Sequence, residues 1–142
     1  MLFWKCDHLL LILLIEDKNY LLQLIESITN DHISRIACGS HHSMAINDKG
    51  ELYTWGEGTN GQLGHGVFNN ELYPRKVIFD VGIKIINVKG GTMHTIALTD
   101  KGYVLGWGSN EHQQLLMKKV TKVNTPHLLP LYEMFTQRCY LV

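Results

Sequence analysis

The eight histidines are the first residues of this 142-residue chain that suggest chemistry. Imidazole nitrogens bind zinc and copper and transfer protons near neutral pH. The densest group comprises His41, His42 and His65, and no cysteine or carboxylate stands at ligand spacing near them. A structural role is therefore favoured over metal binding, and we expect no metal site.

A second candidate is the glycine-rich stretch 56–64, GEGTNGQLG, which has the composition of a phosphate-binding loop. A Walker loop needs G-K-[ST], and a dinucleotide fingerprint must follow a strand and open a helix; neither condition is met. The chain also lacks a G-x-S-x-G motif, and Cys38 lies in an apolar run that predicts a small buried side chain. We therefore predict no catalytic residue, no cofactor and no enzymatic activity.

Composition limits the classes of partner. Thirteen basic residues balance thirteen acidic ones, so no long-range field favours nucleic acid or an anionic membrane. The three cysteines, Cys6, Cys38 and Cys139, form no C-x-x-C pair, and an odd number argues against a disulfide framework. Reduced thiols predict a cytoplasmic location, with the nucleus as the alternative.

The apolar run 9–15, LLLILLI, raises the question of a signal peptide or membrane anchor. Lys5 is offset by Asp7, and the charged residues 16–18 follow where a cleavage site needs small residues. The run is also shorter than a membrane span. A buried strand or a short core helix is favoured, without membrane attachment.

The chain repeats itself at an offset of 52 residues, a period typical of propellers and solenoids. Residues 39–64 align without a gap with residues 91–116, and ten of the 26 columns are identical. The identical pairs are Gly39/Gly91, His42/His94, Ala45/Ala97, Asp48/Asp100, Lys49/Lys101, Gly50/Gly102, Trp55/Trp107, Gly56/Gly108, Gln62/Gln114 and Leu63/Leu115.

Each copy has the pattern of a β-hairpin. In the first copy, β-compatible runs at 42–46 and 51–55 flank the turn NDKG at 47–50, and TDKG at 99–102 matches that turn in the second copy. The final glycine allows a left-handed conformation, and the aspartate side chain is expected to bond the backbone. The two aspartates are thus predicted to form turns and not a catalytic pair.

Neither face of the strand HSMAI at 42–46 is strongly polar, so both faces are expected to be covered. Sheets stacked between neighbouring sheets meet this requirement, and radial repetition of such sheets gives a propeller. Each tryptophan of the repeat precedes a glycine, which suits a buried indole beside a close turn. Segments near 75–78 and 84–88 supply further strands, and Pro74 and Pro126 precede strand starts or edges.

These motifs resemble the repeat of the regulator of chromosome condensation family. The resemblance is carried by IACG, HSMA, GELYTWG and GQLG, at residues 36–39, 42–45, 50–56 and 61–64. It implies an all-β fold: a partial β-propeller of two to three four-stranded blades with an apolar N-terminal segment. Complete propellers of this family commonly have seven blades.

The resemblance also divides the chain. Propeller repeats are expected over 22–130, with 39–90 and 91–130 as units. Residues 1–21 would be an apolar segment, alternatively the end of a decayed repeat, and 131–142 a C-terminal tail.

Two departures from the family pattern are expected to have structural effects. Gly58 stands where the family usually has asparagine, which the second copy keeps as Asn110. The second copy has Gln113 and Leu116 in place of two glycines, so its tight turn is predicted to be altered.

Every repeated residue has a structural reason, so the predicted function is a protein–protein interaction module. The family resemblance implies that such a module is part of a scaffold, ubiquitin-ligase or adaptor chain. Loops carry such contacts, and the candidate binding residues are Glu57, Asn60, Asn69, Asn70, Glu111 and His112. The family resemblance implies one alternative, guanine-nucleotide exchange on a Ran-like small GTPase. A truncated product without independent function is a second alternative.

Overall fold

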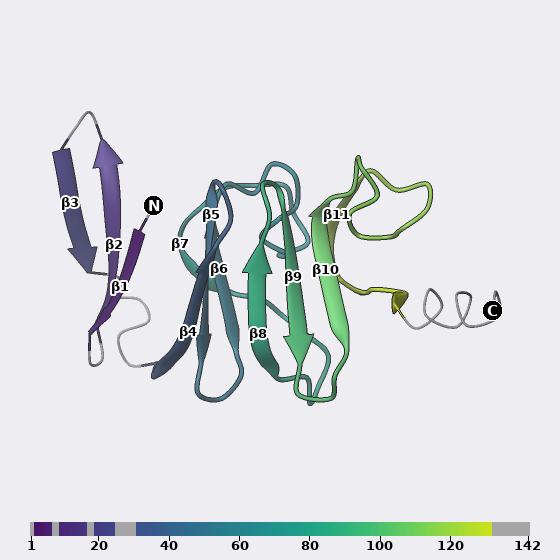
Figure 1. The fold of residues 1–142 in the computed structure, drawn as a ribbon, viewed down its shortest axis with the longest axis horizontal. Coiled ribbons are helices and arrows are strands. Elements are labelled where there is room, and N and C mark those ends of the chain that lie inside the picture. The colour runs from purple at the N-terminus through teal and green to yellow at the C-terminus, as the bar shows by residue number, and fades with distance from the viewer. Residues whose placement is uncertain (1, 7–8, 17–18, 25–30, 132–142) are drawn as a thin grey trace, which may run out of the picture.

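The computed structural model describes residues 2–6, 9–16, 19–24 and 31–131, and it describes side-chain surroundings for 31–131. All the described elements are β-strands, which form three antiparallel sheets (Figure 1). Among the residues described, none forms a helix with the length and hydropathy of a membrane span.

The N-terminal sheet has three strands in the order β1-β2-β3: β1 (Leu2–Cys6), β2 (Leu9–Glu16) and β3 (Asn19–Leu24). The apolar run 9–15 thus forms a strand and not a helix, and the burial expected for it remains a prediction. Residues 25–30 and 132–142 lie outside the described part of the chain. The start of the repeats at residue 22 and the tail at 131–142 therefore remain predictions.

Each repeat folds as one four-stranded antiparallel sheet, here called blade 1 and blade 2 (Figure 1). Blade 1 comprises β4 (Ile33–Cys38), β5 (His42–Asn47), β6 (Leu52–Gly56) and β7 (Glu71–Lys76). Blade 2 comprises β8 (Ile85–Gly90), β9 (His94–Thr99), β10 (Val104–Ser109) and β11 (Lys122–Leu128). The all-β prediction, with four-stranded blades, is confirmed.

The two central hairpins have the same register at an offset of 52 residues. Ala45 is opposite Tyr53 in blade 1, and Ala97 is opposite Leu105 in blade 2. All six residues of β5 are buried, as expected for a strand covered on both faces. Pro74 lies inside β7 and not before it. Because β7 is the edge strand of its sheet, the missing N–H of proline costs little there.

The main core lies between the blades. Blade 1 contributes Met44, Ile46, Leu52 and Val77, and blade 2 contributes Ile85, Val88, Ala97, Leu105 and Trp107. The nearest approach of the two sheets is that of β8 to β4 and β5. There, a Cβ added to Gly90 would lie 2.5 Å from the Gly39 nitrogen, so the inner strands are in backbone contact.

Candidate functional site

The two blades are joined by a buried hydrogen-bond group around the main-chain carbonyl of Gln62. The indole Nε1–H of Trp107 donates to this oxygen at 2.9 Å, and the hydroxyl of Thr95 donates to it at 2.8 Å. His42 Nε2 lies 2.8 Å from Thr95 Oγ1. All four residues are almost completely inaccessible to solvent, so this blade junction is shielded from competition by water.

The proton count at the blade junction fixes the tautomer of His42. The single proton of the Thr95 hydroxyl is used on the Gln62 carbonyl, so Thr95 Oγ1 accepts from His42. Neutral His42 therefore carries its proton on Nε2. Its Nδ1 has no partner among the described residues, which suits a lone pair better than a second proton.

Burial, with a smaller contribution from the nearby His94 ring, lowers the pKa of His42 to about 4. Burial also lowers the pKa of His94. Both rings are consequently neutral near pH 7 and available as hydrogen-bonding groups rather than charges. The sequence predicted a hydrogen-bonded structural role for these histidines, and His42 has that role in the contact with Thr95.

The repeated glycines make room for the histidines and for neighbouring backbone. A Cβ on Gly39 or Gly91 would overlap the ring of His42 or His94, respectively. Gly56 has φ 105° and Gly108 has φ 104°, a region that side chains rarely adopt. A Cβ on either would also meet the strand that starts at the histidine. These glycines are therefore required where they stand.

The hairpin turns are stabilised by the residue before each repeated aspartate. Asn47 Oδ1 accepts from the backbone N–H groups of Lys49 at 3.1 Å and Glu51 at 2.9 Å. In blade 2, Thr99 Oγ1 accepts from the N–H of Tyr103 at 3.0 Å. The side-chain role predicted for Asp48 and Asp100 is wrong, because both carboxylates are exposed and, within residues 31–131, make no side-chain bond to the turn. Gly50 and Gly102 do take the left-handed conformation, at φ 81° and 82°.

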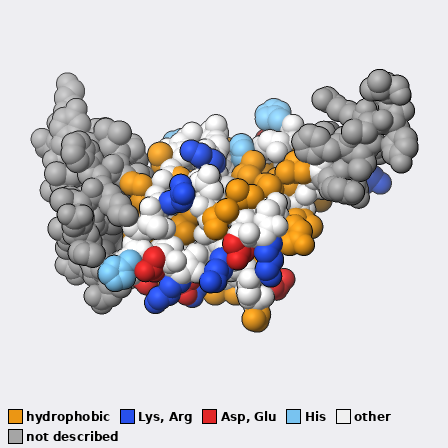
Figure 2. Space-filling view, turned by 60° about the horizontal axis from the view of Figure 1, so that its bottom comes forward, with side chains coloured by type: hydrophobic (Ala, Val, Ile, Leu, Met, Phe, Trp, Pro, Cys, Tyr) orange, Lys and Arg blue, Asp and Glu red, His pale blue; other side chains and the backbone are white. Residues whose placement is uncertain are grey.

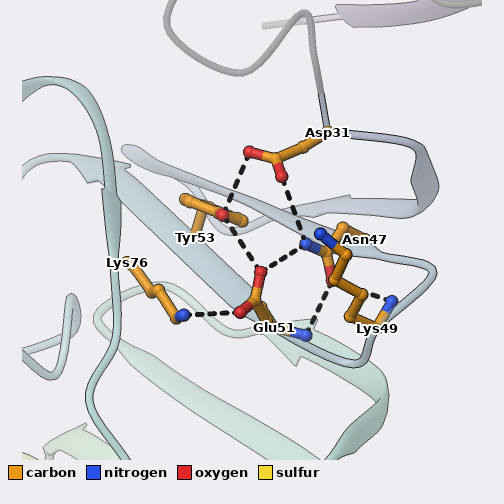
Figure 3. Close-up of polar contacts among 6 residues, drawn as sticks. All are labelled: Asp31, Asn47, Lys49, Glu51, Tyr53 and Lys76. Carbon is orange, nitrogen blue, oxygen red and sulfur yellow. Dashed lines mark hydrogen bonds and ion pairs between the residues drawn. The ribbon is translucent and has the colours of Figure 1, made fainter.

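A polar network not predicted from the sequence lies around the blade 1 turn (Figure 3). Tyr53 donates to Asp31 at 3.1 Å, and Asn47 Nδ2 donates to Glu51 at 2.6 Å. The Lys76 ammonium lies 2.5 Å from Glu51 and, with Asn47, lowers the pKa of that carboxyl. Desolvation and the bond to Asp31 raise the pKa of Tyr53. Because these bonds tie Asp31, the turn residues and the outer-strand Lys76 together, the network braces the turn.

The candidate binding residues of blade 1 lie at the opposite, loop end of the blade. Glu57 accepts from Thr59 at 2.7 Å and lies 3.8 Å from His41. Asn60 donates to the Met93 sulfur at 3.3 Å and so joins the two blades at this end. The structure therefore brings Glu57 and Asn60 together in one loop, although both are engaged by neighbouring side chains.

Of the other four candidates, Asn69 and Asn70 pack against this same loop, whereas Glu111 and His112 belong to blade 2. Asn70 accepts from the Gly58 N–H at 3.0 Å, and the Asn69 carbonyl occupies the space where a Cβ of Gly58 would lie. Asn69 and Asn70 thus occupy the space that the side chain of the family's usual asparagine would fill at position 58. Glu111 and His112 are exposed in the matching loop of blade 2.

The turn in this blade 2 loop keeps its form, contrary to the altered turn that the sequence predicted. Gln113 and Leu116 adopt φ 57° and 58°, close to the 81° and 77° of Gly61 and Gly64. The buried Asn110 side chain holds the loop: its Nδ2 donates to the carbonyls of residues 117 and 120, each at 2.7 Å, and its Oδ1 accepts from the N–H of residue 115 at 2.9 Å.

Two further sequence predictions concern reactive side chains. Cys38 is exposed, so its expected burial is wrong: its neighbour Ala37 packs against the core between the blades, and strand alternation places Cys38 on the opposite face of β4. Within residues 31–131, no three His, Cys, Asp or Glu side chains come together as a metal site.

Sequence reasoning missed an apolar groove at the end of the blades that carries the hairpin turns 47–50 and 99–102, here called the hairpin end. The groove lies between the β7–β8 connection and the outer part of blade 2. It has a volume of about 470 Å³. Figure 2 brings this end forward and shows apolar side chains gathered in its middle. Ile78, Tyr103 and Leu128 are 78%, 55% and 60% exposed, respectively. The residues of this hairpin-end groove are Ile78, Phe79, Asp80, Ile83, Thr99, Tyr103, Leu105, Thr125, Pro126 and Leu128.

Two stacked four-stranded sheets, locked through an indole–carbonyl bond and repeated at a fixed offset, define part of a β-propeller. The chain belongs to the regulator of chromosome condensation repeat family. One model of the regulator of chromosome condensation (RCC1) repeat matches residues 49–98, and a second matches 33–62 and 85–114.

Curated relatives carry the same repeats within much longer chains. The X-linked retinitis pigmentosa GTPase regulator homolog of Caenorhabditis elegans is 43% identical over 100 residues, 69% of this chain and 7% of that protein. The human E3 ubiquitin-protein ligase HERC2 is 44% identical over 95 residues, 66% of this chain and 2% of that protein. The Arabidopsis thaliana ultraviolet-B receptor UVR8 is 38% identical over 64% of this chain and 21% of its own length. This chain therefore spans only a small part of these relatives.

Solved structures show the same fold. Human WBSCR16 superposes with a TM-score of 0.71 at 31% identity, over 82% of this chain and 30% of that chain. Prp20p from Saccharomyces cerevisiae superposes with a TM-score of 0.68 at 22% identity, over 81% of this chain and 30% of that chain.

Proposed function

We propose that this chain is a protein-interaction module that binds a partner protein through the hairpin-end groove. The observation that carries the proposal is the exposure of large apolar side chains around a concave surface, at Ile78, Tyr103 and Leu128. Soluble proteins seldom expose such patches unless a partner covers them. Asp80 at the groove wall adds one polar group that can fix the orientation of an apolar peptide segment.

The residues of the repeat signature support a binding role rather than catalysis. His42, Gln62 and Trp107 are used in the blade junction, and the exposed Asp48 and Asp100 belong to two separate hairpin turns that line one surface hollow. We propose that the chain itself catalyses no reaction and acts in the cytoplasm or nucleus. The similar protein HERC2 is named an E3 ubiquitin-protein ligase, which makes a ubiquitin-pathway component the partner to test first.

The test is quantitative capture of partners by the full chain, with crosslinking and mass spectrometry. Ile78→Asp places a charge in the groove and should abolish capture of a specific partner. Leu72→Asp is the matched control, because Leu72 is 85% exposed and lies outside the groove. Equal capture by wild type and Ile78→Asp, or equal loss with Leu72→Asp, would contradict the proposal.

A second candidate is guanine-nucleotide exchange on a small GTPase. It is favoured by the similarity to a protein named as a GTPase regulator homolog. Release of a fluorescent guanine nucleotide from purified small GTPases distinguishes the two functions. Acceleration by catalytic amounts of the chain would establish exchange, whereas stoichiometric binding without release supports the interaction module.

A further inference from the structure

Two glycines in the loop of blade 1 form the seat for blade 2. A Cβ on Gly64 would lie 2.8 Å from the indole Nε1 of Trp107 and 3.1 Å from its Cε2. A Cβ on Gly61 would lie 2.6 Å from the Val123 carbonyl oxygen and 2.9 Å from the Cα of Asn124. Neither a fused ring nor backbone can move aside cheaply, so blade 1 receives blade 2 because these two positions lack side chains.

The matching positions of blade 2 are Gln113 and Leu116. Their backbone follows the same course as that of the two glycines. The Gln113 N–H donates to the Asn110 carbonyl at 2.9 Å, as that of Gly61 does to the Gly58 carbonyl at 2.8 Å. Both residues also have left-handed φ angles. Each side chain therefore starts from the point where a neighbouring blade would need empty space.

The outward face of blade 2 is the face turned away from blade 1, and it is otherwise suited to a further sheet. Apolar side chains cover it: Leu115, Val123 and Leu129, with Ile96, Val104, Met117 and Leu131 packed beside them. A third blade docked as blade 2 docks on blade 1 would press its indole into Leu116 and its outer strand into Gln113.

We propose that Gln113 and Leu116 make blade 2 a terminal blade, by closing its outward face to a further repeat that carries tryptophan at the position of Trp107. The two residues keep a left-handed backbone, which is strained for any residue other than glycine. Their loop is held by the hydrogen bonds of the Asn110 side chain and not by any hydrogen bond that these two side chains are shown to make. Their side chains instead determine whether a further blade can pack against the outward face of blade 2.

The test extends the full chain with a third repeat. A second copy of residues 84–131 is inserted after Leu131, with Lys101→Arg in the copy so that its peptides differ in mass. The extension is made in the native background and in the Gln113→Gly/Leu116→Gly background. Glu111→Gly/Lys118→Gly is the matched control, because both of these residues are exposed in the same loop. Hydrogen exchange of the added repeat reports whether it docks.

We expect the added repeat to exchange like an unfolded chain in the native and control backgrounds. In the Gln113→Gly/Leu116→Gly background we expect its amides to be protected by roughly tenfold or more, because a docked sheet buries its hydrogen bonds. Protection in the native background would overturn the proposal. Absence of protection in all backgrounds would overturn it too, since the two side chains would then not be what closes the face.

Discussion

The indole Nε1–H of Trp107 donates to the main-chain carbonyl of Gln62 across the blade interface, at 2.9 Å. The two residues are 45 positions apart and belong to different repeats. This bond, shared with the Thr95 hydroxyl at the same oxygen, makes the tryptophan of one repeat a structural part of the preceding one. A single repeat therefore has an unfilled acceptor and an exposed indole, and the pair is the smallest unit that satisfies both.

Trp107→Phe is expected to lower the free energy of unfolding by about 2 kcal/mol. It keeps an aromatic ring in the core but removes the donor to Gln62 and part of the buried volume. Urea denaturation followed by circular dichroism measures the loss. Tyr73→Phe, at a 70% exposed position, is the control and should change stability by less than about 0.5 kcal/mol. An unchanged Trp107→Phe variant would contradict a stabilising role for the bond.

Stability should fall as the pH is lowered from 6.5 to 4. The pKa of His42 is about 4 in the folded chain and 6.5 in the unfolded chain, so the unfolded chain binds more protons in this window. Unfolding is therefore favoured by up to about 3 kcal/mol at the acid end, with no further contribution from His42 below pH 4. Urea denaturation across this range measures the effect. His42→Gln should flatten the profile, whereas the exposed His112→Gln should leave it as in wild type.

Gln113→Gly and Gly61→Gln exchange the same two residue types at matching turns and should have opposite effects. Gln113→Gly removes the strain of a left-handed backbone, but glycine also adds entropy to the unfolded chain. The two effects together should raise the free energy of unfolding by about 0.5–1 kcal/mol. Gly61→Gln introduces that strain and presses on the Val123 carbonyl, at a cost of about 2 kcal/mol or more. Thermal and urea unfolding of the two variants test the pair, and effects of the same sign would contradict the assignment.

Asn47→Ala should destabilise far more than Asp48→Ala. The Asn47 side chain accepts two backbone N–H groups and donates to Glu51, so its removal is expected to cost about 2 kcal/mol. Asp48 is exposed, and its replacement should stay within about 0.5 kcal/mol. Chemical denaturation of both variants provides the measurement. A larger loss for Asp48→Ala would restore the aspartate as the residue that stabilises the turn.

Gly58→Asn should destabilise the chain even though it restores the residue usual in the family. Its Cβ would overlap the Asn69 carbonyl, which has taken that space, and we expect a cost of about 2–3 kcal/mol. Gly82→Asn is the comparison: Gly82 has φ 83° but nothing within 4 Å of its Cβ position, so asparagine should be tolerated there. The midpoint of urea unfolding distinguishes the two variants.

The hairpins and their burial could be predicted from the sequence, because strand periodicity and turn glycines are local signals. The blade junction could not be predicted, since the contact of Gln62 with Trp107 depends on how two sheets stack. The burial of Cys38 was misjudged for a similar reason, because only one face of the inner strand β4 packs against blade 2 and Cys38 lies on the other face. The turn at Gln113 was misjudged because the bonds from Asn110 outweigh the backbone preference.

The hairpin-end groove lay outside the reach of the sequence as well. Ile78 and Leu128 are 50 positions apart, and neither lies in a repeated motif. Their common surface arises because the β7–β8 connection crosses beside the outer strand of blade 2. Contacts between non-repeated segments carry no periodic signal, so such a surface becomes visible only when the sheets are placed side by side.

The contact of Gly39 with Gly90 has a geometric consequence. The sheets touch at backbone level along their inner strands, whereas large rings such as Phe79 and Trp107, with centroids 6.3 Å apart, fill the space farther out. Two sheets that touch at their inner strands and are held apart at their outer strands enclose an angle. Repetition of that angle arranges successive sheets in an arc. A methyl group at Gly90 would push the inner strands apart and reduce the angle between the sheets. The resulting change in curvature would add up with each further sheet.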